Sequence, residues 1–434
     1  MRISTNTIFE QGLGNVLRAQ GQMIRSQEQL ASGKRVTSPA DDPVAASRAL
    51  ELSQSKSMTD QFGRNGELAR ASMVAQESAL ARYTELLQDA KVVAVNSVNA
   101  ALSSAELRSL ATTLQGYYQE MLSVANTTDA NGTYLFSGYQ GSTRPFSETA
   151  PGVVEYRGDD GARLAPIGPG RNVPASQSGA DIFQRIPQGN GYFSATAGGG
   201  NTGTGVVGRG AVLDGMAWAS PGNSRNFELR FHVNSGVTPA STTYDIVDTV
   251  NGVSLLTGQA PAAGPHARAF QPGATIRLET VAPPDTSPQP FDYGAELIIT
   301  GQPGNGDVFT LAPSTPRDVF SVMQDLISAL QGAASGPAGR ARLQNSINAA
   351  QNGLDNALDV NLTMVASLGT YMREVDSAVE AAGDTSMQLS TSLSELQDLD
   401  YAEAINKLSF QQVSLDAAQK SFLRIQELSL FSML

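Results

Sequence analysis

Proline is the residue that most limits what this chain can fold into, because it is concentrated in one part of it. Of the 21 prolines in 434 residues, 18 lie between Pro145 and Pro316, and none lies in 44–144 or 338–434. Proline lacks a backbone donor and clashes with the preceding turn, so it breaks the interior of a helix. The two outer segments are therefore free to form long helices, whereas the middle segment favours another kind of structure.

The C-terminal segment has the heptad pattern of a helix that packs along one seam, with apolar residues spaced alternately four and three apart. Between Leu354 and Leu396 eleven of thirteen seam positions are apolar, and the exceptions are Asn361 and Ser386. At about 1.5 Å per residue this run predicts a rod about 65 Å long. The apolar positions are Leu354, Leu358, Val365, Leu368, Met372, Val375, Val379, Ala382, Leu389, Leu393 and Leu396.

A second C-terminal stripe follows after a slip in phase near Asp400, where we expect a break or hinge. Its members are Ile405, Leu408, Leu415, Ala418, Phe422 and Ile425. The N-terminal segment carries three stripes of the same kind. The first consists of Phe9, Leu13, Val16, Gln20, Met23, Gln27 and Leu30; the second of Met73, Leu80, Tyr83, Leu87, Ala90 and Ala94; the third of Leu107, Leu110, Leu114, Tyr117, Met121 and Val124.

Start and stop signals delimit the N-terminal helices. Gly33 suits the position directly after the first helix, where the backbone turns left-handed. The segment Ser38-Pro39-Ala40-Asp41 fits a capping box with Pro39 at the first helical position. Asp42 followed by Pro43 offers a second helix start just afterwards.

The middle segment, 141–313, has short alternating runs separated by glycine and proline, which is typical of β-strands. Phe227, Leu229 and Phe231 alternate with polar residues, so His232 is expected on the outer face of a strand. Trp218, the single tryptophan, is expected in the core. The segment reads as one or two small β domains inserted into a helical structure.

A lone helix with one apolar stripe buries too little surface to offset the ordering of its backbone, so the two helical ends should pair across the insertion. We therefore expect an α+β fold: a long antiparallel helical coiled-coil rod formed by the N- and C-terminal segments, with an inserted β-rich domain. The expected domains are a terminal helical domain (1–43 with 400–434), a helical rod domain (44–140 with 314–399) and the insertion (141–313).

Composition argues against several functional classes. The chain has no cysteine and two histidines, which excludes thiolate chemistry and disfavours a histidine-rich metal site. Its net charge of -12 argues against nucleic acid and anionic membranes as partners and favours other proteins or further copies of itself. No apolar run is long enough to span a bilayer, and 1–14 lacks the features of a secretory signal, which alone would indicate a cytoplasmic protein.

Two patterns could carry chemistry, and both have a simpler interpretation. Gly203–Gly208 matches G-x-G-x-x-G, but a dinucleotide site would need a strand before it and a helix opening after it. Its glycine-rich flanks favour a loop. The acidic pair Asp41 and Asp42 is explained more simply by capping than by a metal or acid–base pair, and a subunit contact stays open. No catalytic, cofactor-binding or metal-ligating residue is predicted.

Several segments resemble the flagellin superfamily, and within it the hook-associated protein 3 branch rather than filament flagellin. They are MRISTNTIFEQ at the start, LASGKRVTSPADDPVAASRALEL (Leu30–Leu52), NGTYLFSGYQG (Asn131–Gly141) and DLDYAEAINKLSFQQVSLDAAQKSFLRIQELSLFSML at the end. VPASQSGADIF (Val173–Phe183) and ITGQPGNGDVFTLAPS (Ile299–Ser314) resemble hook-associated proteins less specifically. The proline after the paired aspartates favours the hook-associated branch.

The resemblance implies a structural subunit of the bacterial flagellum that joins the hook to the flagellin filament, without enzymatic activity or cofactor. Its implied partners are further copies in a ring, hook-associated protein 1, flagellin, a cytoplasmic export chaperone and the flagellar type III export apparatus. The implied location is extracellular, reached without a cleaved signal peptide, which replaces the cytoplasmic expectation. Ile3–Leu30 and Ala404–Leu434 would line the channel as an inner tube, with Val44–Val124 and Leu354–Leu396 around it.

Two alternatives stay open. The first is a filament flagellin, which would form long filaments by itself. The second belongs to another class, a carbohydrate- or nucleotide-binding module or an enzyme in the β insertion.

Overall fold

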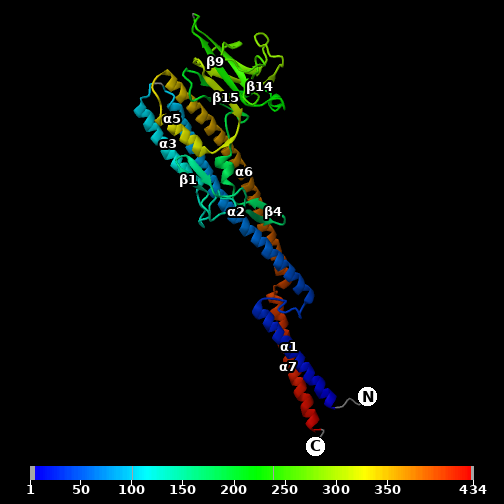
Figure 1. Cartoon of the computed structure of the whole chain (residues 1–434). Coiled ribbons are helices and arrows are strands. Elements are labelled where there is room, and N and C mark those ends of the chain that lie inside the picture. Colours follow the sequence, from blue (N-terminus) through cyan, green and yellow to red (C-terminus); the bar gives the residue numbers. More distant parts are fainter. Residues whose placement is uncertain (1–4, 100, 238, 432–434) are drawn as a thin grey trace. The chain divides into compact units, whose positions relative to one another are not determined.

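The computed structural model describes residues 5–99, 101–237 and 239–431 (Figure 1). The chain divides into two compact units. The first consists of Met1–Glu67, Pro166–Asn172 and Val375–Leu434, and the second of Leu68–Ala165 and Val173–Glu374. The boundary falls inside the two longest helices, α2 (Pro43–Asn96) and α6 (Pro337–Gln397), so each unit contains part of both.

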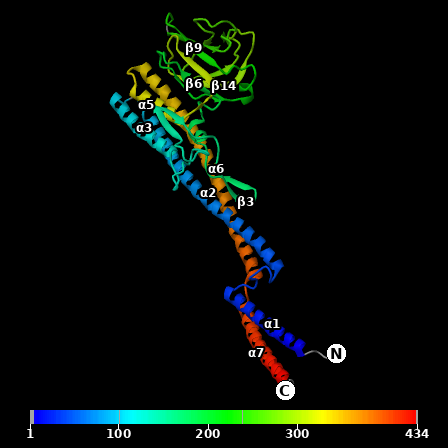
Figure 2. The ribbon, with the colours of Figure 1, turned by 60° about the horizontal axis from the view of Figure 1, so that its bottom comes forward.

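The first unit is mainly helical. Its α1 (Thr5–Ser32) packs antiparallel along α7 (Tyr401–Phe431), and the beginning of α2 packs along the end of α6. Figures 1 and 2 show α1 and α7 side by side in two views. The predicted break near Asp400 is confirmed, because α6 ends at Gln397 and α7 begins at Tyr401. Asp400 caps α7, since its Oδ1 accepts hydrogen bonds from the amides of Ala402 and Glu403.

One predicted helix start is wrong. Ser38-Pro39-Ala40-Asp41 forms a turn, and α2 begins at Pro43. Asp41 Oδ2 accepts from the Thr37 hydroxyl at 2.9 Å and from the Ser38 amide at 2.9 Å, and these bonds, the one from Thr37 first, lower the pKa of Asp41. Asp42 Oδ1 instead accepts from the Ala45 amide, which is the geometry of a helix cap with Pro43 in the first turn.

The second unit contains a helical bundle. The rest of α2 and α6 pack together with α3 (Ser104–Ala125) and α5 (Val319–Gln331). Aromatic rings from the helices and from the segments beside them cluster together, and the Phe183 ring centroid lies within 6.3 Å of those of Tyr83, Phe136, Phe146 and Phe320. One hairpin, β1 (Phe146–Ala150) with β2 (Val153–Tyr156), accompanies these helices, whereas a second, β3 (Leu164–Gly168) with β4 (Arg171–Pro174), has its Pro166–Asn172 in the first unit. A π-helical turn covers Ala180–Gln184.

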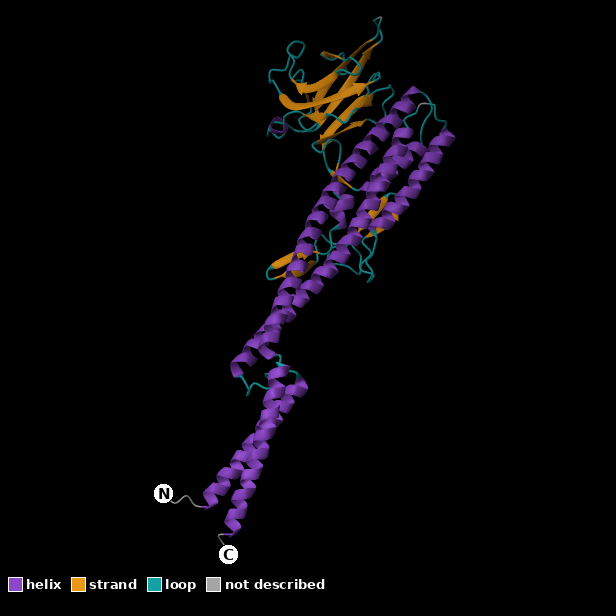
Figure 3. Ribbon diagram, turned by 180° about the vertical axis from the view of Figure 1, so that it is seen from behind, coloured by secondary structure: helices purple, strands orange, loops and turns teal. Residues whose placement is uncertain are grey.

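Residues 193–313 of the insertion pack two antiparallel sheets face to face; Figure 3 shows these strands in orange, gathered together, whereas the remaining orange strands lie along the purple helices. One sheet has the order β11-β10-β9-β15-β6, with β12 also paired to β10, and the other has the order β13-β14-β7, with β8 also paired to β14. Their bounds are β6 Phe193–Ala197, β7 Val206–Val207, β8 Ala211–Val212, β9 Phe227–Asn234, β10 Ser241–Asp248, β11 Val253–Ser254, β12 Arg268–Ala269, β13 Thr275–Glu279, β14 Asp292–Thr300 and β15 Val308–Pro313. The short helix α4 spans Gly215–Trp218.

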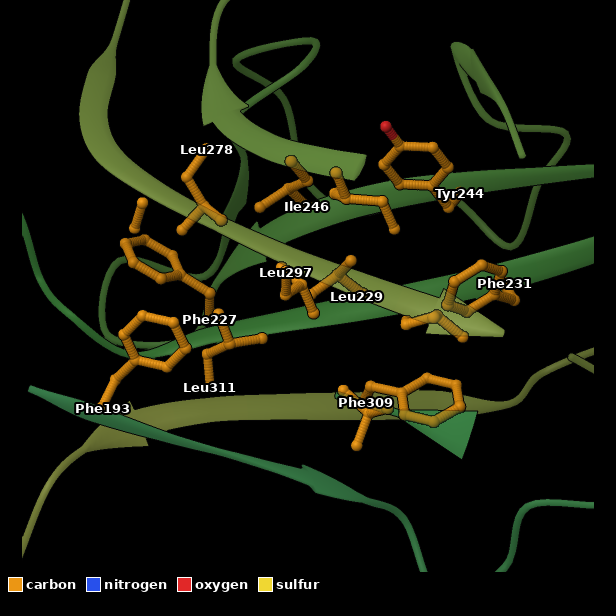
Figure 4. Close-up of a cluster of buried hydrophobic side chains, with 14 of the residues drawn as sticks. Phe193, Phe227, Leu229, Phe231, Tyr244, Ile246, Leu278, Leu297, Phe309 and Leu311 are labelled. Carbon is orange, nitrogen blue, oxygen red and sulfur yellow. The ribbon is translucent and has the colours of Figure 1, made fainter. Parts of the chain in front are cut away.

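The chain enters and leaves these sheets through one two-stranded stem, in which β5 (Ile186–Pro187) pairs with β16 (Pro316–Arg317). The core lies between the sheets, and Figure 4 shows Phe193, Phe227, Leu229, Phe231 and their neighbours meeting there. The predicted alternation in β9 and the burial of Trp218 are confirmed. The expected fold class is also confirmed. Helices from both chain ends pair antiparallel, and along the chain the β-rich insertion lies between them.

Candidate assembly surface

The long seam of α6 faces its helical neighbours. All thirteen predicted positions from Leu354 to Leu396 are buried or half-buried, and none is exposed. Leu354, Leu368 and Val375 are almost fully buried. Leu358, Val365, Met372, Val379, Leu389, Leu393 and Leu396 are half-buried. The spacing in the sequence therefore identified which face of this helix turns inward.

Hydrogen bonds and ion pairs connect α2 and α6 at separate points along the two helices. In the second unit, the Asn361 Nδ2 donates to Leu80 O at 3.0 Å and to Thr84 Oγ1 at 2.7 Å, and Lys91 Nζ pairs with Asp355 Oδ1 at 2.5 Å. Between these two contacts the residue number rises by seven on α2, from Thr84 to Lys91, and falls by six on α6, from Asn361 to Asp355. This is the pattern of an antiparallel helix pair. These bonds fix the register of the two helices, because a slip would leave them unpaired.

The first unit has a comparable cross-helix bond. Ser386 Oγ donates to Asp60 Oδ1 at 2.6 Å, and Lys56 Nζ pairs with Asp60 Oδ2 at 2.9 Å. The bond from Lys56, followed by the one from Ser386, lowers the pKa of Asp60. Ser386 is one of the two polar positions in the predicted seam, so its polarity is matched by a partner on the facing helix.

The α1–α7 pair covers only part of its apolar surface. The Phe9 and Phe422 rings lie 5.0 Å apart, and Leu415 is buried. Val16, Met23, Leu30 and Leu408 are half-buried, Phe9 and Leu13 are partly exposed, and Ile405 is exposed. The predicted Ile425 lies outside the residues whose side chains the structure describes.

Large apolar side chains on the same two helices point into solvent. Phe410 is 76% exposed and Val413 is 69% exposed, and both lie on α7. Leu17 and Ile24 on α1, and Leu423 on α7, are also exposed. Single exposed apolar residues are ordinary, and this group on one helical pair makes the pair a candidate assembly surface. Sequence reasoning missed Phe410 and Val413, because they lie off the predicted stripe.

Asparagine side chains of α6 hold the β insertion by its backbone. Asn345 accepts from the Val207 amide and donates to Gly205 O, so its amide group pairs with β7 as a neighbouring strand would. Asn356 donates to Pro187 O and Gly189 O and accepts from Arg209 Nη2. No pattern in the sequence predicted these contacts, since each partner is a main-chain atom or a loop residue far along the chain.

The G-x-G-x-x-G segment does not have the surroundings of a nucleotide site. Val206–Val207 forms the short strand β7, and the next residues lead to β8 rather than to a helix. The loop that precedes β7 is held by the buried Asp307 carboxylate, which accepts hydrogen bonds from the amides of Thr202 and Gly203 in that loop. The same carboxylate accepts from the amide of Gly304. The segment is therefore a loop and a short edge strand.

Other chemistry is sparse in the part of the chain that the structure describes. No group of three or more metal-ligating side chains occurs among those residues. A cavity of about 440 Å³ is lined by Thr196, Arg209, Arg317, Asp325 and Ser346, among others, and Arg317 is paired with Asp325. No described helix combines the length and apolarity needed to cross a membrane.

Comparison with known proteins gives a consistent result. The family described as the bacterial flagellin N-terminal helical region matches residues 3–141. The chain is 36% identical over 186 residues to flagellar hook-associated protein 3 of Salmonella typhimurium, which covers 43% of this chain and 58% of that protein. It is 24% identical over 434 residues to flagellar hook-associated protein 3 of Escherichia coli, which covers 100% of this chain and 99% of that protein.

Solved structures and flagellins complete the comparison. The crystal structure of flagellar hook-associated protein 3 from Legionella pneumophila superposes with a TM-score of 0.68 at 25% identity, over 80% of this chain and 98% of that one. Flagellin of Listeria monocytogenes aligns at 26% identity with 31% of this chain and 47% of that protein. The chain is thus similar to hook-associated proteins along its length and to flagellins over a part.

Proposed function

We propose that this chain, which belongs to the hook-associated protein 3 group of the flagellin superfamily, is the structural subunit that joins the flagellar hook to the flagellin filament. The observation that carries the proposal is the exposed apolar surface of the α1–α7 pair, above all Phe410 and Val413. Leaving such a surface in water costs free energy, and neighbouring subunits that cover it would remove that cost. A tubular stack of subunits supplies such neighbours.

In this proposal the terminal helices, 1–43 and 400–434, line the channel as an inner tube. The rod segments, 44–140 and 314–399, surround that tube, and the insertion, 141–313, faces outward. Support comes from the burial of the predicted seams, since α6 covers all of its seam positions inside the subunit, whereas the seam residues Phe9, Leu13 and Ile405 of α1 and α7 are exposed.

The partners follow from the same proposal. Copies of the chain form a ring that contacts hook-associated protein 1 on one side and flagellin on the other. A cytoplasmic chaperone and the flagellar type III apparatus deliver the subunit to the outside of the cell without a cleaved signal peptide. The role is structural rather than catalytic, in agreement with relatives that are named flagellar hook-associated proteins.

A deletion strain tests the proposal. Without the gene we expect hooks to remain, filaments to be lost and flagellin to be shed into the medium, and the wild-type chain restores filaments. The variant carrying Phe410→Asp and Val413→Asp should fold normally, because both side chains are largely exposed, and should fail to restore filaments. Met216→Asp is the matched control, because Met216 is 87% exposed on the insertion. Full restoration by the double variant would refute the proposed assembly surface.

The filament flagellin alternative predicts a different result. A flagellin assembles into long filaments from purified subunits, whereas a junction subunit stops at short assemblies. Electron microscopy of the concentrated protein separates the two. The binding-module alternative is tested by titrating the full chain with nucleotides and sugars, where saturable binding would favour it.

A further inference from the structure

The two helix breaks of the first unit are hydrogen-bonded to each other. One break, 33–42, separates α1 from α2, and the other, 398–400, separates α6 from α7. The Arg35 amide donates to Gln397 O at 2.6 Å, and the Leu399 amide donates to Gly33 O at 3.0 Å. Lys34 and Asp398 lie opposite each other in an antiparallel bridge. The two connections therefore form one joint rather than two independent linkers.

Arg35 contacts the ends of three helices at this joint. Its Nη2 donates to Leu396 O in the last turn of α6 at 2.9 Å. Its Nη1 lies 3.7 Å from Oδ2 of Asp42, the residue that caps α2. Its carbonyl accepts from Gln29 Nε2 near the end of α1 at 2.6 Å. A cation suits the C-terminal end of a helix, whose last carbonyls lack partners within the helix.

Gly33 adds a second constraint. Its φ of +69° ends α1 in the left-handed conformation, and its amide donates to Gln29 O. A Cβ added at this position would lie 2.8 Å from the hydroxyl of Tyr401, the first residue of α7. Any larger residue is therefore strained at this position and would also displace Tyr401.

We propose that Arg35 is a positioning residue that locks this joint, so that the α1–α7 pair and the adjoining ends of α2 and α6 are held as one body. Both helix pairs have their own apolar contacts, so they form without Arg35, and the arginine sets only the connection between them. The lock is needed for assembly, because a subunit must present its terminal helices in one orientation to the next subunit. This last step rests on the proposed junction function.

Hydrogen exchange on the full-length monomer tests the lock. In Arg35→Ala the amides of residue 35 and of Leu399 should exchange about tenfold faster, while amides inside α1 and α7 keep their protection. Arg18→Ala is the matched control for exchange, because the bonds that Arg18 makes within the described part of the chain go to Gly14 and Asn15 in its own helix. Gly33→Ala should also open the joint, because the added Cβ strains the backbone and displaces Tyr401. It should accelerate the exchange of the same two amides. Arg35→Lys, which keeps one donor group, should lie between Arg35→Ala and the wild type.

Two results would overturn the lock. The first is unchanged exchange of these two amides in Arg35→Ala. The second is a loss of protection throughout α1 and α7, which would make Arg35 a residue required for the helices themselves. In the deletion strain Arg35→Ala should restore few filaments, and Met216→Asp, which lies outside the terminal helices, should restore them fully. Full restoration by a variant with an opened joint would refute the need for the lock, whereas failure of the wild-type chain to restore filaments would refute the junction function instead.

Discussion

Asn361 is a buried polar residue in an otherwise apolar seam, and replacing it by leucine should stabilise the protein. Its side chain is fully buried, its Nδ2 makes two hydrogen bonds to α2, and its Oδ1 has no hydrogen-bond partner among the described residues. Leucine has the same branching as asparagine, so it fits the site with little change in shape. Thr84 Oγ1 keeps its own bond to Leu80 O, so α2 gains no unpaired donor.

The opposing terms can be compared from the structure. Loss of two hydrogen bonds costs about 1 kcal/mol each, and removal of the unpaired carbonyl oxygen returns about 1–3 kcal/mol. Burial of a leucine side chain adds about 2 kcal/mol. We therefore expect Asn361→Leu to raise the free energy of unfolding by about 1–3 kcal/mol. Asn361→Ala should lower it by about 1–2 kcal/mol, because it removes the same bonds and leaves a cavity.

Urea unfolding followed by far-UV circular dichroism measures the order of the three proteins. Amide exchange in 76–90 and 354–368 assigns the change to the contact between α2 and α6. The reasoning predicts the order Asn361→Leu, then wild type, then Asn361→Ala. A leucine variant less stable than the wild type by about 1 kcal/mol or more would show that the two bonds outweigh the burial and desolvation terms.

Three further predictions concern the insertion. Asp307→Asn should lower its stability by about 2 kcal/mol, since the buried carboxylate accepts three backbone amides, and a urea titration should show this loss. Asn345→Ala should speed exchange of the Val207 amide without unfolding the sheets, and unchanged exchange would contradict the docking contact. Burial lowers the pKa of His266, with Asp245 opposing the shift and His232 and Arg230 adding to it, so the unfolded chain binds more protons. Stability should therefore fall as the pH drops below about 6.5, and the dependence should weaken in His266→Asn, as measured by unfolding at a series of pH values.

Local signals in the sequence identified most of the helical structure. The positions of proline separated the helical ends from the β insertion. Proline lacks a backbone donor and breaks a helix at its own position, and this effect does not depend on the tertiary contacts. Heptad spacing identified the inward face of α6, and the slip in phase located the break before α7. The alternation in β9 and the burial of Trp218 followed from equally local patterns.

One local signal was ambiguous. The Ser38–Asp41 segment has the residues of a capping box, and Asp41 does accept from the Ser38 amide, but in a turn. The same side-chain bond occurs in both structures, so the sequence could not separate them. In the structure the segment forms a turn, and the helix cap of α2 comes from Asp42 instead of Ser38.

Contacts between distant segments were decided by the tertiary structure alone. Arg35 and Asn345 are ordinary polar residues in the sequence, and their importance depends on Leu396 and Val207, which come near them only after folding. The order of strands in the two sheets is equally hidden. Spacing along a chain reports which side of an element is apolar, because that property is periodic and local. Which atoms a polar side chain finds depends on how the elements meet, and a hydrogen bond exists only when both partners have been brought within about 3 Å.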